Sequence, residues 1–205
     1  MEQVFAKFSL PDAIRSDDGA PFGSSAAAGV SRLAVWWLKL GIEPRYIPPS
    51  SPQDNGRHER MRRTLKAETT HPPAETRAQQ QVRFNLFRRH YNEERPHEAL
   101  AQMPPAAHWR PSPRRFAEHL DEPWYDADHQ VRRVRRSGEI KWRGNLIFVG
   151  EAFAGETIGL VEVDNDCHIV RFLGRDLGVI DRSDCFHRFA PPRARLRVPV
   201  ETYET

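Results

Sequence analysis

Two carboxylates in this 205-residue chain have neighbours that suit a metal ligand. Asp17 follows a strand candidate at residues 12–15 and lies in a turn that contains Gly19. Glu59 lies near the start of an expected helix, just after the turn-forming pair Asn55-Gly56. Carboxylates fixed at a strand end and on a helix can hold divalent metals, which activate an attacking oxygen and stabilise a leaving oxygen in phosphoryl transfer.

Each of these carboxylates also has an ordinary interpretation. Asp17-Asp18-Gly19 is a common turn sequence. On a solvated helix, Glu59 would form an ion pair with Arg62 or Arg63, three and four positions later. The residues alone therefore leave both roles open.

Basic side chains recur directly after Glu59. Arg60, Arg63 and Lys66 follow one another at steps of three, so a helix places them in one stripe beside the proposed metal site. Such a stripe could hold nucleic-acid phosphates near the metal. The alternative is a charged face that serves solubility only.

A second basic cluster surrounds Trp142. A basic hairpin with an exposed aromatic ring can bind a DNA backbone, whereas a Trp142 that points inward with Ile140 would be part of the core. Both interpretations stay open. The candidate DNA contacts in this cluster are Arg133, Arg135, Lys141, Trp142 and Arg143.

Charge and composition favour a polyanionic partner. The net charge is +3 and the pI is about 9.1; neutralising phosphates with Lys and Arg releases counterions, which favours binding. The sequence contains no apolar run that could cross a bilayer and no signal-peptide pattern at its start, so we expect a cytoplasmic protein without a membrane partner. Cys167 and Cys185 form no Cys-x-x-Cys pair, which argues against a zinc site.

The chain changes character near residue 110. Helical spacing at 29–40, 59–69 and 75–91, with a second short strand at 45–47, predicts an α/β region over residues 1–110. The sequence then predicts a proline-rich linker at 111–128, a small all-β barrel of short strands at 129–188 and a disordered tail at 189–205.

Three segments, in this order, resemble a known catalytic core. "AIRSDDGAPF" resembles the strand and turn around the second Asp of the DDE integrase core, with Asp18 where Asn is usual. "PPSSPQDNGRHERMRRTLKAE" resembles the loop and helix with the catalytic Glu, and "YNEERPHEAL" the segment that closes the core. The region 131–180 resembles the C-terminal domain of the insertion-sequence subgroup whose helix starts "NGRHERM".

The resemblance implies a DDE-type insertion-sequence transposase with a ribonuclease-H-like, retroviral-integrase-like core. It implies Asp17 and Glu59 as catalytic residues and as ligands of Mg²⁺ or Mn²⁺. The implied activity is DNA cleavage and strand transfer in DNA recombination, integration and transposition. The implied partners are DNA and either a homo-oligomer or a full-length transposase.

This sequence departs from the family pattern in two ways. Between Asp17 and Glu59 lie 41 residues, more than is usual, with the extra length around 23–31. The family's first Asp lies upstream of the segment that begins this chain, so we expect a partial core that is poorly packed, beside an independent barrel, and inactive alone. The alternatives are a non-catalytic DNA-binding remnant that modulates full-length transposase, and an inert product. A search for an upstream reading frame that encodes the first strand of the core would distinguish these alternatives.

Overall fold

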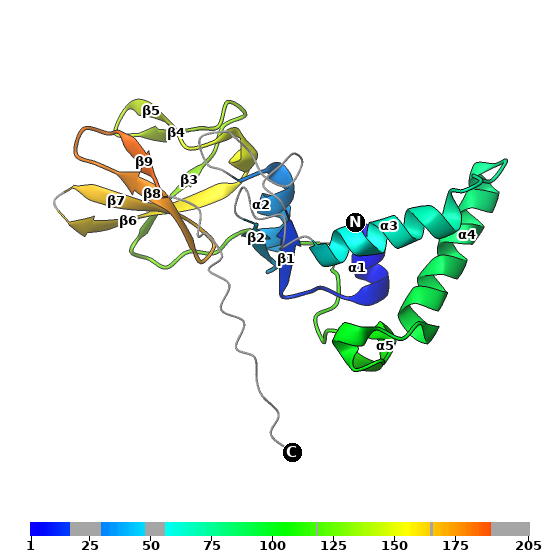
Figure 1. The fold of residues 1–205 in the computed structure, drawn as a ribbon. Coiled ribbons are helices and arrows are strands. Elements are labelled where there is room, and N and C mark those ends of the chain that lie inside the picture. Colours follow the sequence, from blue (N-terminus) through cyan, green and yellow to red (C-terminus); the bar gives the residue numbers. More distant parts are fainter. Residues whose placement is uncertain (17–29, 48–55, 118, 165, 190–205) are drawn as a thin grey trace, which may run out of the picture. The chain divides into compact units, whose positions relative to one another are not determined.

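The computed structural model describes residues 1–16, 30–47, 56–117, 119–164 and 166–189 (Figure 1). The chain divides into two compact units. The first combines Met1–Pro49 with Arg114–Thr205, and the second is Ser50–Pro113. Asp17 and most of the predicted tail, from residue 190 on, lie outside the described residues.

The N-terminal part of the first unit contains a parallel pair of strands. Its elements are α1 (Glu2–Phe8), β1 (Ala13–Ser16), α2 (Arg32–Lys39) and β2 (Glu43–Tyr46). β1 and β2 pair in parallel, with Ala13 opposite Glu43. α2 begins after Ser31, whose side chain accepts a hydrogen bond from the Ala34 amide at 3.1 Å. Both short strands were expected from the sequence within one or two residues, and α2 begins three residues after the start of the expected helix at 29–40.

The C-terminal part of the first unit is all β apart from one short 3-10 turn. Its elements are β3 (His129–Arg133), β4 (Glu139–Trp142), β5 (Asn145–Phe148), η4 (Glu151–Phe153), β6 (Thr157–Asp164), β7 (Cys167–Phe172), β8 (Arg175–Ile180) and β9 (Phe186–Arg188). Five strands form one antiparallel sheet in the order β3-β6-β7-β8-β9, and β4 pairs with β5 in a separate hairpin.

The closed barrel expected from the sequence is not found among the described strands. β3 and β9 are the two edges of the five-stranded sheet, and no ladder joins them. β3 pairs with β6, with Val131 opposite Gly159, instead of with its sequence neighbour β4. The mixed α/β class is confirmed, whereas the barrel is corrected to an open antiparallel sheet with an additional hairpin.

A single hydrophobic core joins the two parts of the first unit. Trp37 of α2 and Ile42 are fully buried in the same cluster as Phe153 and Phe172, whose rings meet edge to face at 5.3 Å. The expectation of a poorly packed N-terminal part is therefore wrong for α2, since the β-rich part covers its apolar face.

The proline-rich segment 111–128 is packed at both ends. The Arg114 guanidinium donates to the carbonyls of Leu40 at 2.5 Å and Pro11 at 3.1 Å, and the Phe116 ring lies 6.3 Å from that of Phe5. Near the other end, the Tyr125 hydroxyl donates to the Thr157 carbonyl at 2.8 Å. These contacts fix the segment, while the expected domain boundaries at 110 and 128 stay a prediction.

The second unit is helical. It contains α3 (Gly56–Thr69), α4 (Arg77–Arg89), η2 (His90–Glu94), η3 (Glu98–Leu100) and α5 (Pro105–His108). A capping box starts α4, in which the Thr76 hydroxyl accepts from the Gln79 amide and the Gln79 side chain accepts from the Thr76 amide. No helix in the described ranges has the length and apolar character that a membrane span requires.

Candidate nucleic-acid interface and metal site

Glu59 lies exposed in the first turn of α3. A carboxylate is favoured there because the helix dipole places partial positive charge at the N-terminus. The ion pair with Arg62 or Arg63 that the sequence also allowed does not form, and Glu59 makes no hydrogen bond or ion pair with any described residue. Asp17 lies outside the described residues, so the approach of Asp17 to Glu59 stays a prediction.

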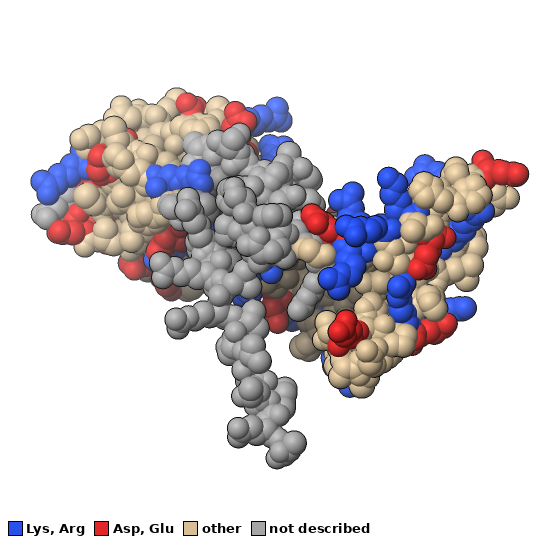
Figure 2. Space-filling view, in the orientation of Figure 1, with Lys and Arg blue, Asp and Glu red and all other residues tan. Residues whose placement is uncertain are grey.

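The basic stripe on α3 is exposed as predicted. Arg60, Arg63 and Lys66 are all exposed. Arg62 is exposed as well and adds a fourth cation, which the predicted spacing of three did not include. Figure 2 shows Lys and Arg side chains gathered along α3. Within the described part of the chain these four cations have no carboxylate partner, so their charge is available to an external anion.

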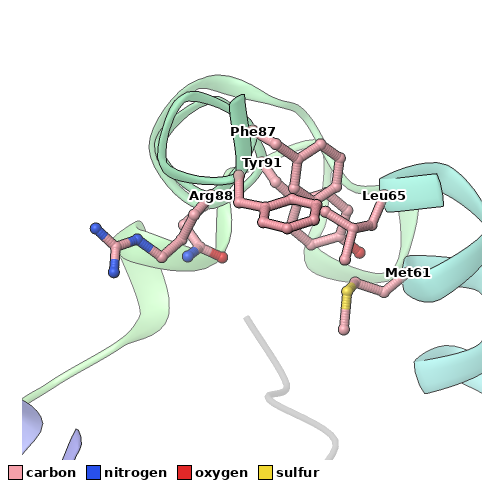
Figure 3. Close-up of a pocket in the computed structure, with 7 residues that line it drawn as sticks. Met61, Leu65, Phe87, Arg88 and Tyr91 are labelled. Carbon is pink, nitrogen blue, oxygen red and sulfur yellow. The ribbon is translucent and has the colours of Figure 1, made fainter. Parts of the chain in front are cut away.

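The opposite face of α3 is apolar. Met61 and Leu65, one turn apart, line a groove of about 430 Å³ with Phe84, Phe87 and Tyr91 (Figure 3). Phe87 and Tyr91 stack with ring centroids 5.4 Å apart. Because the apolar side chains pack toward α4, the cations of α3 are left facing solvent.

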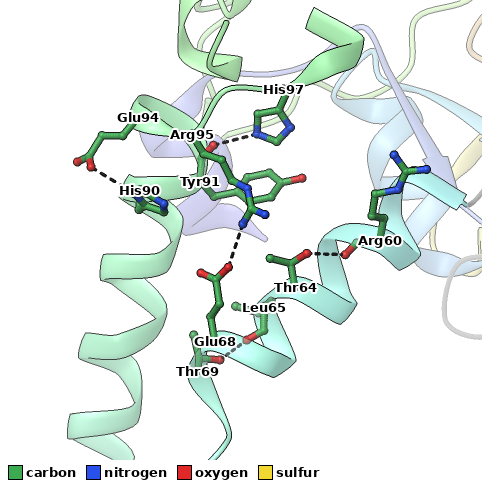
Figure 4. A network of polar contacts seen from close by, with 10 residues as sticks. All are labelled: Arg60, Thr64, Leu65, Glu68, Thr69, His90, Tyr91, Glu94, Arg95 and His97. Carbon is green, nitrogen blue, oxygen red and sulfur yellow. Dashed lines mark hydrogen bonds and ion pairs between the residues drawn. The ribbon is translucent and has the colours of Figure 1, made fainter. Parts of the chain in front are cut away.

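A polar network fixes the far end of α3 to the segment after α4 (Figure 4). Arg95 Nη1 lies 2.9 Å from Glu68 Oε1, and the Arg95 guanidinium lies 5.9 Å from the Tyr91 ring centroid. His97 meets Tyr91 edge to face at 4.6 Å. The segment 91–100 thus holds the helix that carries Glu59 and the basic stripe.

In the sheet region, Trp142 belongs to the core. It is only 2% exposed, lies 4.7 Å edge-on from His168, and has the guanidinium groups of Arg132 and Arg143 at 5.4 and 5.5 Å from its ring. The prediction that Trp142 is an exposed DNA contact is therefore wrong, and the alternative, a core side chain, is confirmed. The reason is the alternation of β4, which buries Ile140 and Trp142 together.

The cations around Trp142 remain accessible. Arg133, Arg135, Lys141 and Arg143 are exposed, and Arg143 occupies a left-handed position (φ 46°) in the β4–β5 turn. Its Nη2 lies 2.8 Å from Asp166 Oδ1, and this hydrogen bond lowers the pKa of the Asp166 carboxyl. Arg143 is thus paired with a carboxylate, whereas Arg133, Arg135 and Lys141 have no carboxylate partner among the described residues.

One group of potential metal ligands was missed by the sequence reasoning. Asp126, Asp128 and His129 have ligand atoms within 4.8 Å of one another. His129 Nδ1 lies 2.7 Å from Asp128 Oδ1, and its Nε2 lies 3.4 Å from Arg171 Nη1. Both ring nitrogens are engaged and a guanidinium cation is adjacent, so a hydrogen-bond network explains this group better than a metal does. The Asp-x-Asp-His spacing was the signal in the sequence.

Two family models match this chain. Residues 40–105 match the Integrase core domain, and residues 129–184 match the IS481 family transposase, C-terminal domain. The chain is thus similar to integrase cores in one segment and to the C-terminal domain of IS481 family transposases in another. The first match contains α3 with Glu59 and the basic stripe, and the second contains the five-stranded sheet up to β8 with the β4–β5 hairpin.

Individual relatives come from retroviruses and from an insertion element. The Gag-Pol polyprotein of Baboon endogenous virus is 37% identical over 76 residues, which is 37% of this chain and 4% of that protein. The Pol polyprotein of Radiation murine leukemia virus is 33% identical over 70 residues, or 34% of this chain and 11% of that protein. The Insertion element IS476 uncharacterized 39.2 kDa protein of Xanthomonas euvesicatoria is 33% identical over 107 residues, or 52% of this chain and 29% of that protein. The matched part of this chain thus spans less than a third of each relative.

Proposed function

We propose that this chain belongs to the integrase and transposase family and takes part in metal-dependent DNA cleavage and strand transfer of the DDE type, in DNA integration and transposition. The observation that carries the proposal is the surface of α3. On that helix, inside the segment that matches the integrase core, exposed Glu59 lies next to the exposed cations Arg60, Arg63 and Lys66.

Glu59 and Asp17 are the proposed ligands of Mg²⁺ or Mn²⁺. Both metals prefer oxygen donors, and the Glu59 carboxylate is exposed and not engaged by any described residue, so its chemistry fits. Such an ion, when bound, would activate a water or a 3′-hydroxyl for attack on a phosphodiester. The parallel pair β1 and β2 is proposed to be part of a ribonuclease-H-like sheet, with Asp17 next in the chain after β1.

The basic stripe of α3 has a positioning role in this proposal. Arg60, Arg63 and Lys66 bind backbone phosphates, because such contacts fix the register of DNA on a protein without reading its sequence. Binding of phosphates there sets the scissile bond beside Glu59. Arg133, Arg135, Lys141 and Arg143 of the sheet region supply a second set of phosphate contacts.

Catalysis with two metals is proposed to need a third carboxylate besides Asp17 and Glu59. Two carboxylates can hold one metal weakly but do not easily hold two metals about 4 Å apart. The chain on its own is therefore proposed to bind DNA without strand transfer. Strand transfer by the purified 205-residue chain would overturn this part of the proposal.

A non-catalytic role in DNA binding is the second candidate function. It is favoured by the exposed cations in both matched segments, which could bind DNA whether or not a metal is held. In that role the chain would modulate a full-length transposase by joining its oligomers or occupying its DNA.

The α3 surface can be tested by DNA affinity as a function of salt. We compare the parent chain with an Arg60→Gln/Arg63→Gln/Lys66→Gln variant by fluorescence anisotropy on duplex DNA. Each lost phosphate contact should reduce the slope of log K against log salt by about 0.9. A control variant, Lys7→Gln/Arg32→Gln/Arg77→Gln, removes the same charge from exposed positions elsewhere. Equal slopes for the two variants would contradict a DNA site on α3.

A further inference from the structure

The first unit presents an indole that the proposed DNA chemistry does not use. Trp124 is 79% exposed, more than any other large hydrophobic side chain in the described ranges. Aromatic side chains, Trp among them, are enriched at protein interfaces. Trp124 is therefore the strongest sign of a contact surface outside α3.

The backbone around Trp124 is anchored. The neighbouring Tyr125 hydroxyl donates to the Thr157 carbonyl at 2.8 Å and accepts from the Leu173 amide at 3.3 Å. Gly159 leaves the space that the Tyr125 ring fills, since a Cβ there would lie 2.6 Å from the ring. The backbone next to Trp124 is thus anchored through Tyr125 to β6 and to the turn after β7. This anchoring reduces the conformational entropy that the segment would lose on binding a partner.

The charge around Trp124 selects the kind of partner. Exposed carboxylates flank it in the sequence: Asp121, Glu122, Asp126 and Asp128. Asp128 bonds to His129, but the other three form no side-chain hydrogen bond or ion pair with any described residue. DNA phosphates would be repelled here, whereas Arg and Lys side chains could lie over the indole face and pair with the carboxylates.

The same chain carries a surface of the opposite, complementary charge on α3. α3 exposes Arg60, Arg62, Arg63 and Lys66 without a carboxylate partner in the described part of the chain. We propose that the acidic segment 121–128, centred on Trp124, binds α3 of a second copy of this chain. DNA and the second copy then compete for α3, which links self-association to the absence of DNA. The proposal needs an accessible α3 but no metal and no catalysis.

Sedimentation velocity of the full chain, without DNA or metal, tests the proposal. We expect concentration-dependent self-association at low salt that weakens as salt screens the charges. Trp124→Ala should raise the dissociation constant about tenfold, as expected for a central aromatic side chain. Trp109→Ala, the matched change at another exposed Trp, should leave it unchanged.

A charge exchange identifies the two surfaces. The variant Glu122→Arg/Asp126→Arg and the variant Arg62→Glu/Arg63→Glu should each fail to self-associate, and their mixture should associate. A parent chain that stays monomeric at low salt, an unchanged Trp124→Ala variant, or a mixture that stays monomeric would each overturn the proposal. A Trp124→Ala variant that loses DNA affinity instead of self-association would replace it with a DNA contact. None of these outcomes depends on whether α3 binds DNA.

Discussion

Lys39 Nζ in α2 lies 3.0 Å from Glu156 Oε2 just before β6, 117 positions later in the sequence. The two side chains are 22% and 21% exposed, so the pair is only partly screened by water. It lies in the unit where α2 and the sheet region share one hydrophobic core. α2 and the sheet region are thus coupled through a charge pair as well as through apolar packing.

This pair should contribute to stability. Lys39→Met should lower the free energy of unfolding by about 1 kcal/mol, because a partly buried charge-assisted hydrogen bond stabilises the fold more than an exposed one does. Urea denaturation of Lys39→Met, Glu156→Gln and the double variant gives the coupling. The exposed pair Arg45–Glu43, at 2.8 Å, is the control and should give a coupling near zero. A coupling energy for Lys39–Glu156 that is no larger than that for Arg45–Glu43 would contradict the prediction.

Arg114 joins three segments of the first unit. Its guanidinium donates to the carbonyls of Leu40 and Pro11 and to Asp12 Oδ1 at 3.2 Å. Lys has no planar fork and cannot make all three bonds, so Arg114→Lys should cost about 2 kcal/mol and increase amide hydrogen exchange in β1 and at the end of α2. Arg115→Lys at the exposed neighbour should leave both quantities unchanged. Equal exchange in the two variants would refute this role.

Gly178 in β8 lies where no side chain fits. A Cβ there would lie 2.4 Å from the His187 carbonyl oxygen and 2.6 Å from the Phe186 ring. Gly178→Ala should therefore displace β9 and destabilise the chain by about 1–3 kcal/mol, measured by thermal or urea unfolding. A Cβ on Gly174, in the preceding turn, meets nothing within 4 Å, so Gly174→Ala is the matched control with little expected change. Similar losses in both variants would show that the close approach is not the cause.

Asp181 should make stability depend on acid pH. The His187 side chain at 2.7 Å, followed by the amides of Cys185 and Ser183, lowers the pKa of the Asp181 carboxyl. A carboxyl with a lowered folded-state pKa stabilises the fold above its unfolded pKa, and this contribution is lost as pH falls through the folded value. The parent should exceed Asp181→Asn in stability near neutral pH, and the difference should vanish at low pH. Carboxyl titration by NMR measures the pKa directly, and an ordinary value would contradict the assignment.

Local patterns in the sequence predicted the elements that depend on neighbours in the chain. The periodicity of 29–40 and the turn at Asn55-Gly56 located α2 and the start of α3, and spacing by three placed Arg60, Arg63 and Lys66 on one exposed stripe. These features depend on helix geometry alone, which short stretches of sequence determine.

Features that depend on distant partners were not predictable in the same way. The alternation of residues along the strand predicted that Ile140 and Trp142 lie on one face, but it could not predict that this face packs into the core. The order β3-β6-β7-β8-β9 depends on β3 pairing across the β4–β5 hairpin, which no local signal encodes. The packing of Arg114 against Leu40 likewise joins residues 74 positions apart.

We propose that Glu59 on α3 holds a divalent metal where the neighbouring cations bind DNA phosphates. DNA affinity of the parent chain and of Glu59→Gln, with and without Mn²⁺ at constant ionic strength, tests it most directly. Mn²⁺ should tighten DNA binding by the parent, because the metal offsets the carboxylate charge and contacts phosphate oxygen. Glu59→Gln should bind DNA more tightly than the parent without metal and should not respond to Mn²⁺. An equal response of the two proteins to Mn²⁺ would contradict a metal site at Glu59.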